Sequence, residues 1–178
     1  VLSVLEFINL TNKIIKNKFY SLISNLFFVV YIFIFCLFFF YFSNFVHLKV
    51  ILYSLLLCCV ASDIGGFVFG KTFKGPKITK ISPNKTYAGS LGSIIFSMVV
   101  FSGLMISFTN NFNYMILIIA IITSTACQFG DLFFSFLKRK AKIKDTGNFL
   151  PGHGGILDRL DGIFLGIPIG FISLTIFY

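Results

Sequence analysis

Long apolar runs separated by short polar segments dominate the chain. Five of these runs are each about 17–24 residues long, enough for a helix that rises about 1.5 Å per residue to cross a hydrocarbon core. The pattern therefore predicts an all-α fold, a polytopic transmembrane helical bundle with about five spans and two basic loops. The expected spans are 25–46, 50–70, 89–108, 114–137 and 162–178.

The first 24 residues differ from the spans because they are mildly amphipathic and carry Lys13, Lys16 and Lys18. We interpret residues 1–24 as an amphipathic or interfacial segment, or as the end of a longer N-terminal membrane region. A signal peptide is not expected, since the apolar run that follows is too long. Residues 25–178 would then form one transmembrane domain.

The composition supports a membrane protein, with 57% hydrophobic and only 12% charged residues. Soluble domains carry about 25% charged residues. The formal net charge of +9 would suit a nucleic-acid-binding protein, but such proteins rarely contain this many unbroken apolar runs. We therefore expect a lipid bilayer and no nucleic acid as partner. All four cysteines lie in apolar runs, and no disulfide is expected.

The basic residues indicate the orientation of the spans. With a cytoplasmic N-terminus, the N-terminal segment and the loops at 71–85 and 138–160 share one side of the membrane, and that side holds every Lys and Arg except Lys49. Such a distribution follows the positive-inside rule. It predicts a multi-pass membrane protein whose site faces the cytosol, and the bias of the composition toward Phe, Ile, Lys and Asn favours a bacterial inner membrane.

Carboxylates inside apolar spans mark a candidate site, because an ionised group there is unfavourable unless it has a function or a partner. In the expected topology Asp63 and Asp131 both lie about 10 Å below the cytosolic face. Asp158 and Asp161 begin the last span at i, i+3 spacing, which places both on one helix face. The alternative is that each Asp only pairs with a Lys or caps a broken helix. Four carboxylates beneath basic loops favour divalent-metal and phosphate chemistry.

Residues 135–161, SFLKRKAKIKDTGNFLPGHGGILDRLD, resemble the signature of the phosphatidate cytidylyltransferases, also called CDP-diacylglycerol synthases, along its whole length. The segment 82–89, SPNKTYAG, is similar to the SPxKTxEG loop of that family. Asp63 with Gly66 and Gly70 is similar to the preceding span, and Gly130-Asp131 to the pair before the signature. The family motifs thus fall within 63–161.

This resemblance implies a magnesium-dependent transfer of CMP from CTP to phosphatidate, which yields CDP-diacylglycerol and pyrophosphate. It implies Mg²⁺ as the cofactor, with a second cation as a further option, and Asp131, Asp158 and Asp161 as its ligands. Lys138 and Arg159 would join these aspartates in catalysis. The residues expected to bind the substrates are Asp63, Ser82, Lys85, Thr86, Arg139, His153, Gly154 and Gly155.

Several simpler interpretations stay open. Ser82 or Thr86 is equally well explained as a helix N-cap. The GxxxG spacings at Gly66/Gly70 and in 162–170 indicate close helix packing, within the bundle or between the subunits of a homodimer. We expect that the amides at the start of the last helix, after Gly162, are able to face an anion.

Two departures from the family pattern keep other functions in view. Ala88 stands where the family usually has Glu, and the chain is short for the family, as if several N-terminal spans were absent. A CTP-dependent lipid kinase and a non-catalytic membrane homologue are the alternatives. A CDP-alcohol phosphotransferase is disfavoured, because its DGxxAR pattern with the following aspartates is absent.

Overall fold

The computed structural model describes residues 1–79, 82, 85–147 and 154–177. Across these ranges the chain forms six helices and no strand, apart from an isolated antiparallel bridge between Lys77 and Thr86. The helices are α1 (Leu2–Ile14), α2 (Lys18–Ser43), α3 (Val46–Phe73), α4 (Tyr87–Thr109), α5 (Met115–Lys140) and α6 (Leu157–Phe177). Helices α2 to α6 are long and apolar enough to cross a membrane. The predicted all-α bundle with five spans is confirmed.

The helices extend beyond the apolar runs, because backbone hydrogen bonding continues where the side chains become polar. Helix α2 begins at Lys18, inside the segment 1–24, where the side chain of Asn17 accepts a hydrogen bond from the Phe19 amide at 3.0 Å. Helix α6 begins at Leu157, five residues before the expected start of the last span at Gly162. Its first turns therefore include Asp158 and Asp161, as their i, i+3 spacing predicted, although the apolar run itself begins only at Gly162.

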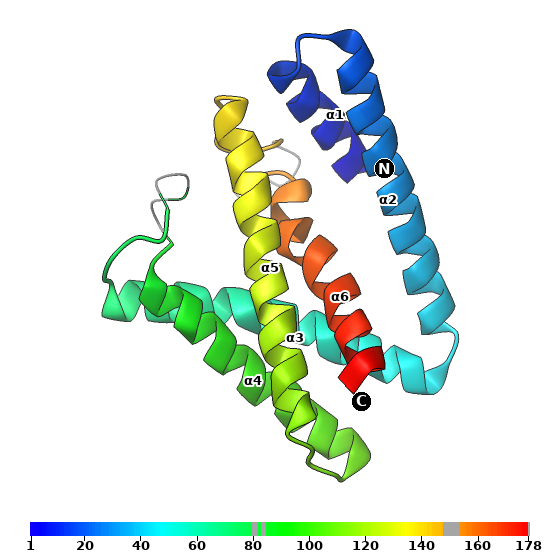
Figure 1. Ribbon diagram of the computed structural model, residues 1–178, viewed down its shortest axis with the longest axis vertical. Coiled ribbons are helices and arrows are strands. Elements are labelled where there is room, and N and C mark those ends of the chain that lie inside the picture. Colours follow the sequence, from blue (N-terminus) through cyan, green and yellow to red (C-terminus); the bar gives the residue numbers. More distant parts are fainter. Residues whose placement is uncertain (80–81, 83–84, 148–153, 178) are drawn as a thin grey trace.

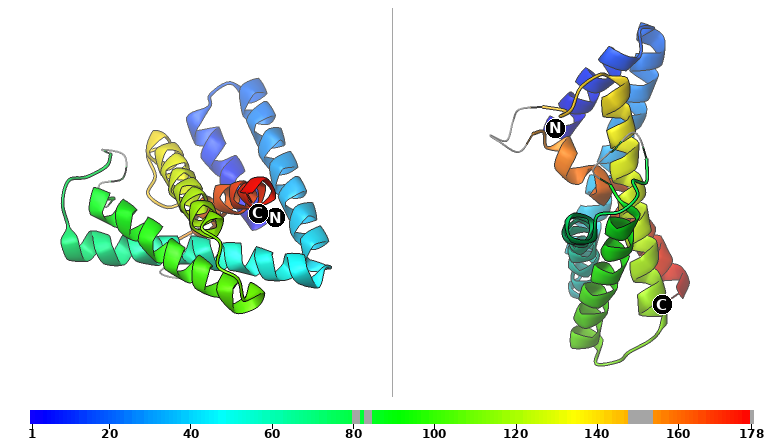
Figure 2. Two further views of the ribbon diagram at one scale, coloured as in Figure 1. Left: turned by 60° about the horizontal axis from the view of Figure 1, so that its bottom comes forward. Right: turned by 90° about the vertical axis from the view of Figure 1, so that its left-hand side faces the viewer.

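The helices pack as pairs that cross at a large angle. Helix α3 packs most extensively on α4, and α5 on α6. Figure 1 shows α3 running across α5 and α6 rather than along them, and the right-hand view of Figure 2 looks nearly down α3 while α5 runs along the page. Helices α1 and α2 form a hairpin beside α6 (Figure 1).

Glycines allow these close approaches. A Cβ added at Gly65 on α3 would lie 2.5 Å from the backbone oxygen of Gly92 on α4, and one at Gly66, in the first GxxxG spacing, would lie 2.6 Å from the Ser93 hydroxyl oxygen of α4. Between α6 and its neighbours, a Cβ at Gly162 would lie 2.6 Å from the sulfur of Cys127, and one at Gly166 equally near that of Cys59. The expected packing at the GxxxG spacings is thus confirmed within the bundle, while a homodimer stays a prediction.

Polar side chains join the helices through hydrogen bonds, as is typical of membrane bundles. The hydroxyls of Ser62 on α3 and Ser124 on α5 lie 2.9 Å apart, and both side chains are fully buried. The Ser97 hydroxyl on α4 donates to the backbone oxygen of Cys58 at 3.1 Å. Each contact satisfies a polar group that lipid could not.

An aromatic cluster fixes α1 against the bundle. Phe7 of α1 stacks on Phe28 of α2, with ring centroids 3.8 Å apart. Phe28 in turn meets Phe134 of α5 and Phe164 of α6 edge-on at 6.3 and 6.2 Å. The N-terminal helix therefore packs against three other helices, and its position follows from apolar packing.

We predict that Gly65→Ala destabilises the bundle by about 1–3 kcal/mol, because the added methyl group meets backbone that cannot move aside. Gly103→Ala is the matched control on α4, since a Cβ there meets nothing within 4 Å. Thermal unfolding in detergent would measure both variants. Equal unfolding midpoints would contradict the proposed role of the close approach.

Candidate functional site

A pocket of about 350 Å³ lies where α3, α4, α5 and α6 meet, and it collects the acidic residues of the spans. Four carboxylates and three cationic side chains share its lining. The lining residues are Asp63, Gly66, Phe67, Ile78, Lys85, Thr86, Gly89, Ser90, Ser93, Gln128, Asp131, Lys138, Asp158, Arg159 and Asp161. A larger hollow of about 800 Å³ between α1 and α2 has no carboxylate in its lining, so we place the candidate chemistry in the smaller pocket.

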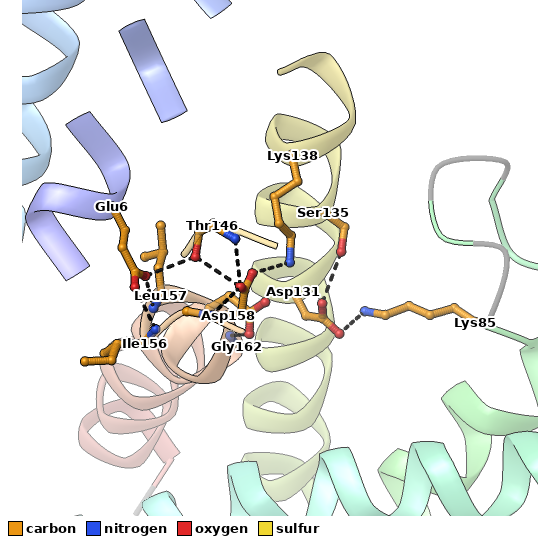
Figure 3. A network of polar contacts seen from close by, with 12 residues as sticks. Glu6, Lys85, Asp131, Ser135, Lys138, Thr146, Ile156, Leu157, Asp158 and Gly162 are labelled. Atoms are coloured by element: carbon orange, nitrogen blue, oxygen red, sulfur yellow. Dashed lines mark hydrogen bonds and ion pairs between the residues drawn. The ribbon is translucent and has the colours of Figure 1, made fainter. Parts of the chain in front are cut away.

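Asp131 meets a cation that comes from the loop before α4. Its Oδ2 forms an ion pair with the Nζ of Lys85, and its Oδ1 accepts a hydrogen bond from the Ser135 hydroxyl at 3.3 Å (Figure 3). The Lys85 and Asp131 side chains keep 23% and 31% of their surface exposed. This pair is therefore open to an incoming anion or cation.

Asp158 has the larger number of partners. Its Oδ1 accepts from Lys138 Nζ at 2.7 Å, while its Oδ2 accepts from the amide and the hydroxyl of Thr146 at 2.9 and 3.0 Å. The Gly155 amide donates to the same Oδ2 at 3.0 Å. Both oxygens are engaged, so Asp158 connects α5, α6 and the loop between them.

Asp161 and Asp63 complete the acidic lining. Asp161 is 8% exposed, and its Oδ1 accepts from the Gly162 amide at 2.8 Å. Asp63 enters from α3, where its Oδ1 lies 3.8 Å from the Cys127 sulfur. The two residues come from different helix pairs, so the pocket joins both halves of the bundle.

Two glycines make this arrangement sterically feasible. A Cβ at Gly130 would lie 2.5 Å from the backbone oxygen of Asp161, so glycine lets α5 and α6 touch beside the pocket. Gly154 has φ +79°, a conformation that side chains with a Cβ rarely adopt, and a Cβ there would lie 3.2 Å from Asp158 Oδ2.

Comparison with known proteins identifies the family. The sequence pattern of the cytidylyltransferase family matches residues 1–177. The chain belongs to the cytidylyltransferase family. The resemblance predicted from the motifs is confirmed.

Curated relatives of this cytidylyltransferase chain cover similar parts of it. A phosphatidate cytidylyltransferase of Helicobacter pylori is 41% identical over 69% of this chain and 46% of its own length. One of Rickettsia bellii is 43% identical over 67% of this chain and 56% of its own length. One of Mycobacterium leprae is 34% identical over 70% and 40%. The chain spans about half the length of the curated relatives it matches.

The structure brings together most of the residues predicted for a cytidylyltransferase site. Those in the pocket lining are Asp63, Lys85, Thr86, Asp131, Lys138, Asp158, Arg159 and Asp161. Ser82, Arg139, Gly154 and Gly155 do not line it, and His153 lies outside the described residues. Thr86 is also the N-cap of α4, because its side chain accepts from the Gly89 amide at 3.1 Å.

The amides at the start of α6 do not face an anion in the way that the sequence suggested. Those of Ile156 and Leu157 donate to Glu6 of α1, at 3.0 and 2.8 Å, and that of Gly155 donates to Asp158. The anions at these amides are therefore carboxylates of the protein itself, and the helix start lies at Leu157 rather than after Gly162. Sequence reasoning overlooked Glu6, although its signal was present: it is the only carboxylate in the N-terminal segment.

The donor chemistry of the pocket fits the Mg²⁺ expected for the family. Four carboxylates offer the oxygen ligands that Mg²⁺ prefers. Within the described ranges, no three His, Cys, Asp or Glu side chains are grouped so that they could hold a metal ion. Mg²⁺ at phosphate sites often uses only one or two protein carboxylates, and water and substrate phosphates complete its coordination. This pocket can supply those carboxylates.

We predict that Lys138→Met lowers the free energy of unfolding by about 2–4 kcal/mol, since it leaves Asp158 without its cation in a largely enclosed place. The two side chains are only 12% and 10% exposed. The double variant with Asp158→Asn should lose less than the sum of the single losses. Thermal unfolding checks this, with the exposed Lys140→Met as control. Additive losses would show that the pair is not coupled.

Proposed function

We propose that this chain transfers CMP from CTP to phosphatidate, with CDP-diacylglycerol and pyrophosphate as products. The observation that carries the proposal is the grouping of four carboxylates and three cations in one pocket of a cytidylyltransferase-family bundle. The names of the curated relatives agree with this reaction.

The chemistry needs positioning more than proton transfer. A phosphate oxygen of phosphatidate attacks the α-phosphorus of CTP, and the bond from this phosphorus to the bridging oxygen of pyrophosphate breaks. A phosphate monoester is already ionised near neutral pH, so the attack needs no strong base. Catalysis then depends on holding the two phosphates in line and on neutralising their charge.

The cationic residues of the pocket suit this task. Lys85 comes from a loop, Lys138 from α5 and Arg159 from α6, so they reach the pocket from three directions. We assign them to the triphosphate of CTP and the headgroup of phosphatidate. Their present carboxylate partners keep two of them, Lys85 and Lys138, directed into the pocket.

We propose Mg²⁺ as the cofactor, held by Asp131 and Asp161 with Asp63 beside them. When bound, the ion would offset negative charge on the reacting phosphates. Asp158, predicted from sequence as a third ligand, already accepts three hydrogen bonds and shares the Thr146 hydroxyl with Glu6, so we assign it first to loop organisation. The carboxylates also balance the cations while the substrates are absent.

The position of the pocket suits one soluble and one membrane substrate. Asp63 lies ten residues before the end of α3 and Asp131 nine before the end of α5, and both ends lead into basic loops. We propose that this end faces the cytosol of a bacterial cell, from a site in its inner membrane. CTP would then enter from water and phosphatidate from the adjacent leaflet.

A CTP-dependent lipid kinase is the enzymatic alternative, because it would use the same nucleotide in the same setting. The family match favours cytidylyl transfer, while Ala88 in the first turn of α4, where the family usually has Glu, keeps a non-catalytic homologue in view. The products separate the three functions.

We predict that the protein moves label from the cytidine of CTP into the lipid fraction when phosphatidate and Mg²⁺ are present, with release of pyrophosphate. Asp131→Asn should lower the rate at least about a hundredfold, because it removes a carboxylate proposed to hold Mg²⁺ at the reacting phosphates. Lys49→Gln, at the other end of α3, is the control and should keep full activity. Label recovered as soluble CDP, with a phosphorylated lipid, would instead identify a kinase.

Removal of divalent metal should abolish this transfer. Chelation is expected to stop label incorporation, and added Mg²⁺ should restore it, because the three cations of the pocket share it with four carboxylates and leave no net positive charge to offset the phosphates. The measurement is the initial rate against free Mg²⁺ concentration. Full activity in excess chelator would contradict the assignment of Mg²⁺.

A further inference from the structure

A buried carboxylate outside the pocket contacts the segments that form it. Glu6 on α1 is 8% exposed. Its Oε1 accepts from the Ile156 amide at 3.0 Å, and its Oε2 accepts from the Leu157 amide at 2.8 Å and the Thr146 hydroxyl at 3.0 Å (Figure 3). These three partners lie about 140 to 151 positions away in sequence, so the contacts are wholly tertiary.

These contacts satisfy the N-terminus of α6. The first amides of a helix have no partner within the helix, and the positive end of the helix dipole favours a negative charge there. Glu6 supplies this charge from another helix, while Asp158 accepts from the preceding amide of Gly155. The start of α6 is therefore held between two carboxylates.

The same contacts connect Glu6 to the pocket through short links. Thr146 lies at hydrogen-bond distance from both Glu6 and Asp158, and Asp158 contacts Lys138. Helix α6 begins at Leu157, so Asp158 and Arg159 follow directly, and a shift of its start would displace both in the pocket.

The fit around Glu6 is close, and α1 has its own anchor. A Cβ at Gly147 would lie 2.7 Å from Glu6 Oε1, and one at Gly155 would lie 2.6 Å from Oε2. Phe7, the next residue, packs in the aromatic cluster with Phe28. That cluster also contains Phe134 of α5, so α1 has anchors on α2 and α5 as well as on α6, and the carboxylate is held in place for the loop and for the start of α6.

We propose that Glu6 is a positioning residue: it holds the start of α6 and the segment at Thr146 in place, and thereby orients Asp158 and Arg159 toward the substrates. Its effect on turnover rests on the proposed CMP transfer, whereas its effect on the loop does not.

The test is Glu6→Gln in the full-length protein, purified in detergent. The Gln amide keeps the size of the side chain but removes its charge. It also turns an N–H donor toward the backbone amides that Glu6 accepts from, so one of those hydrogen bonds is lost. We expect kcat per folded protein to fall about tenfold or more, because small misplacements of reacting groups are costly. KM for CTP should change much less. Hydrogen exchange at Ile156 and Leu157 should become faster, and Glu6→Asp should recover part of kcat.

Thr11→Val is the control on the same helix. It removes the contact of the Thr11 hydroxyl with Asn25 of α2, at 2.6 Å, without touching the loop or α6. It should leave kcat and the exchange of Ile156 and Leu157 unchanged. Equal losses of kcat in Glu6→Gln and Thr11→Val, or unchanged exchange in Glu6→Gln, would overturn the proposal.

The two readouts separate this proposal from the proposed function. If the unaltered protein transfers no CMP, the proposed function fails, and the exchange comparison alone decides the role of Glu6. If transfer is observed and Glu6→Gln retains full kcat, the positioning role fails while the proposed function stands.

Discussion

The absence of water inside the bilayer is the constraint on which this structure depends. Every charged or polar group at membrane depth must find a partner within the protein. The chain meets this requirement by gathering four aspartates at one end of the bundle, with Lys85, Lys138 and Arg159 beside them. Grouping the charges in one enclosed pocket also brings together the groups that phosphate chemistry requires, so the same arrangement serves stability and function.

The close packing of the helices supports this grouping. Gly65 and Gly130 let the backbones touch within each helix pair, and Gly166 lets α6 approach Cys59 of α3, so that Asp63 from one pair shares a pocket with Asp131 and Asp161 from the other. Each aspartate sits on a regular helix, whose internal hydrogen bonds hold it more firmly than a loop would. Among the charged residues of the pocket, Lys85 differs because it comes from a loop. A pocket with rigid carboxylates and one cation on a loop suits substrates that enter and leave.

Much of this could be predicted from the sequence, because hydropathy and charge act locally. The five apolar runs predicted the spans. Asp63 and Asp131 were indicated as site residues because an ionised group inside a span is unfavourable unless it has a partner or a function. The position of α6 could not be obtained in this way. Its first turn is polar, so hydropathy placed the start of the span at Gly162. The i, i+3 spacing of Asp158 and Asp161 indicated a helix before that point, but only the structure shows that it begins at Leu157.

The contact between Glu6 and α6 lies beyond sequence reasoning for a different reason. Helix α1 is held near the loop by the cluster in which Phe7 stacks on Phe28, which in turn meets rings of α5 and α6, and no local pattern reports such a contact. Likewise, the sequence indicated that Asp158 belongs to the site but not that its oxygens bind Thr146 and Gly155. These are properties of the assembled bundle.

The Thr146 hydroxyl has a further consequence. Its oxygen lies 3.0 Å from both Glu6 Oε2 and Asp158 Oδ2, yet it carries a single proton and can donate to only one of them at a time. The loop therefore has two hydrogen-bond arrangements that differ only by rotation of one O–H bond. Through this rotation the network can shift its support from one carboxylate to the other, as charge in the pocket changes, while the backbone stays in place.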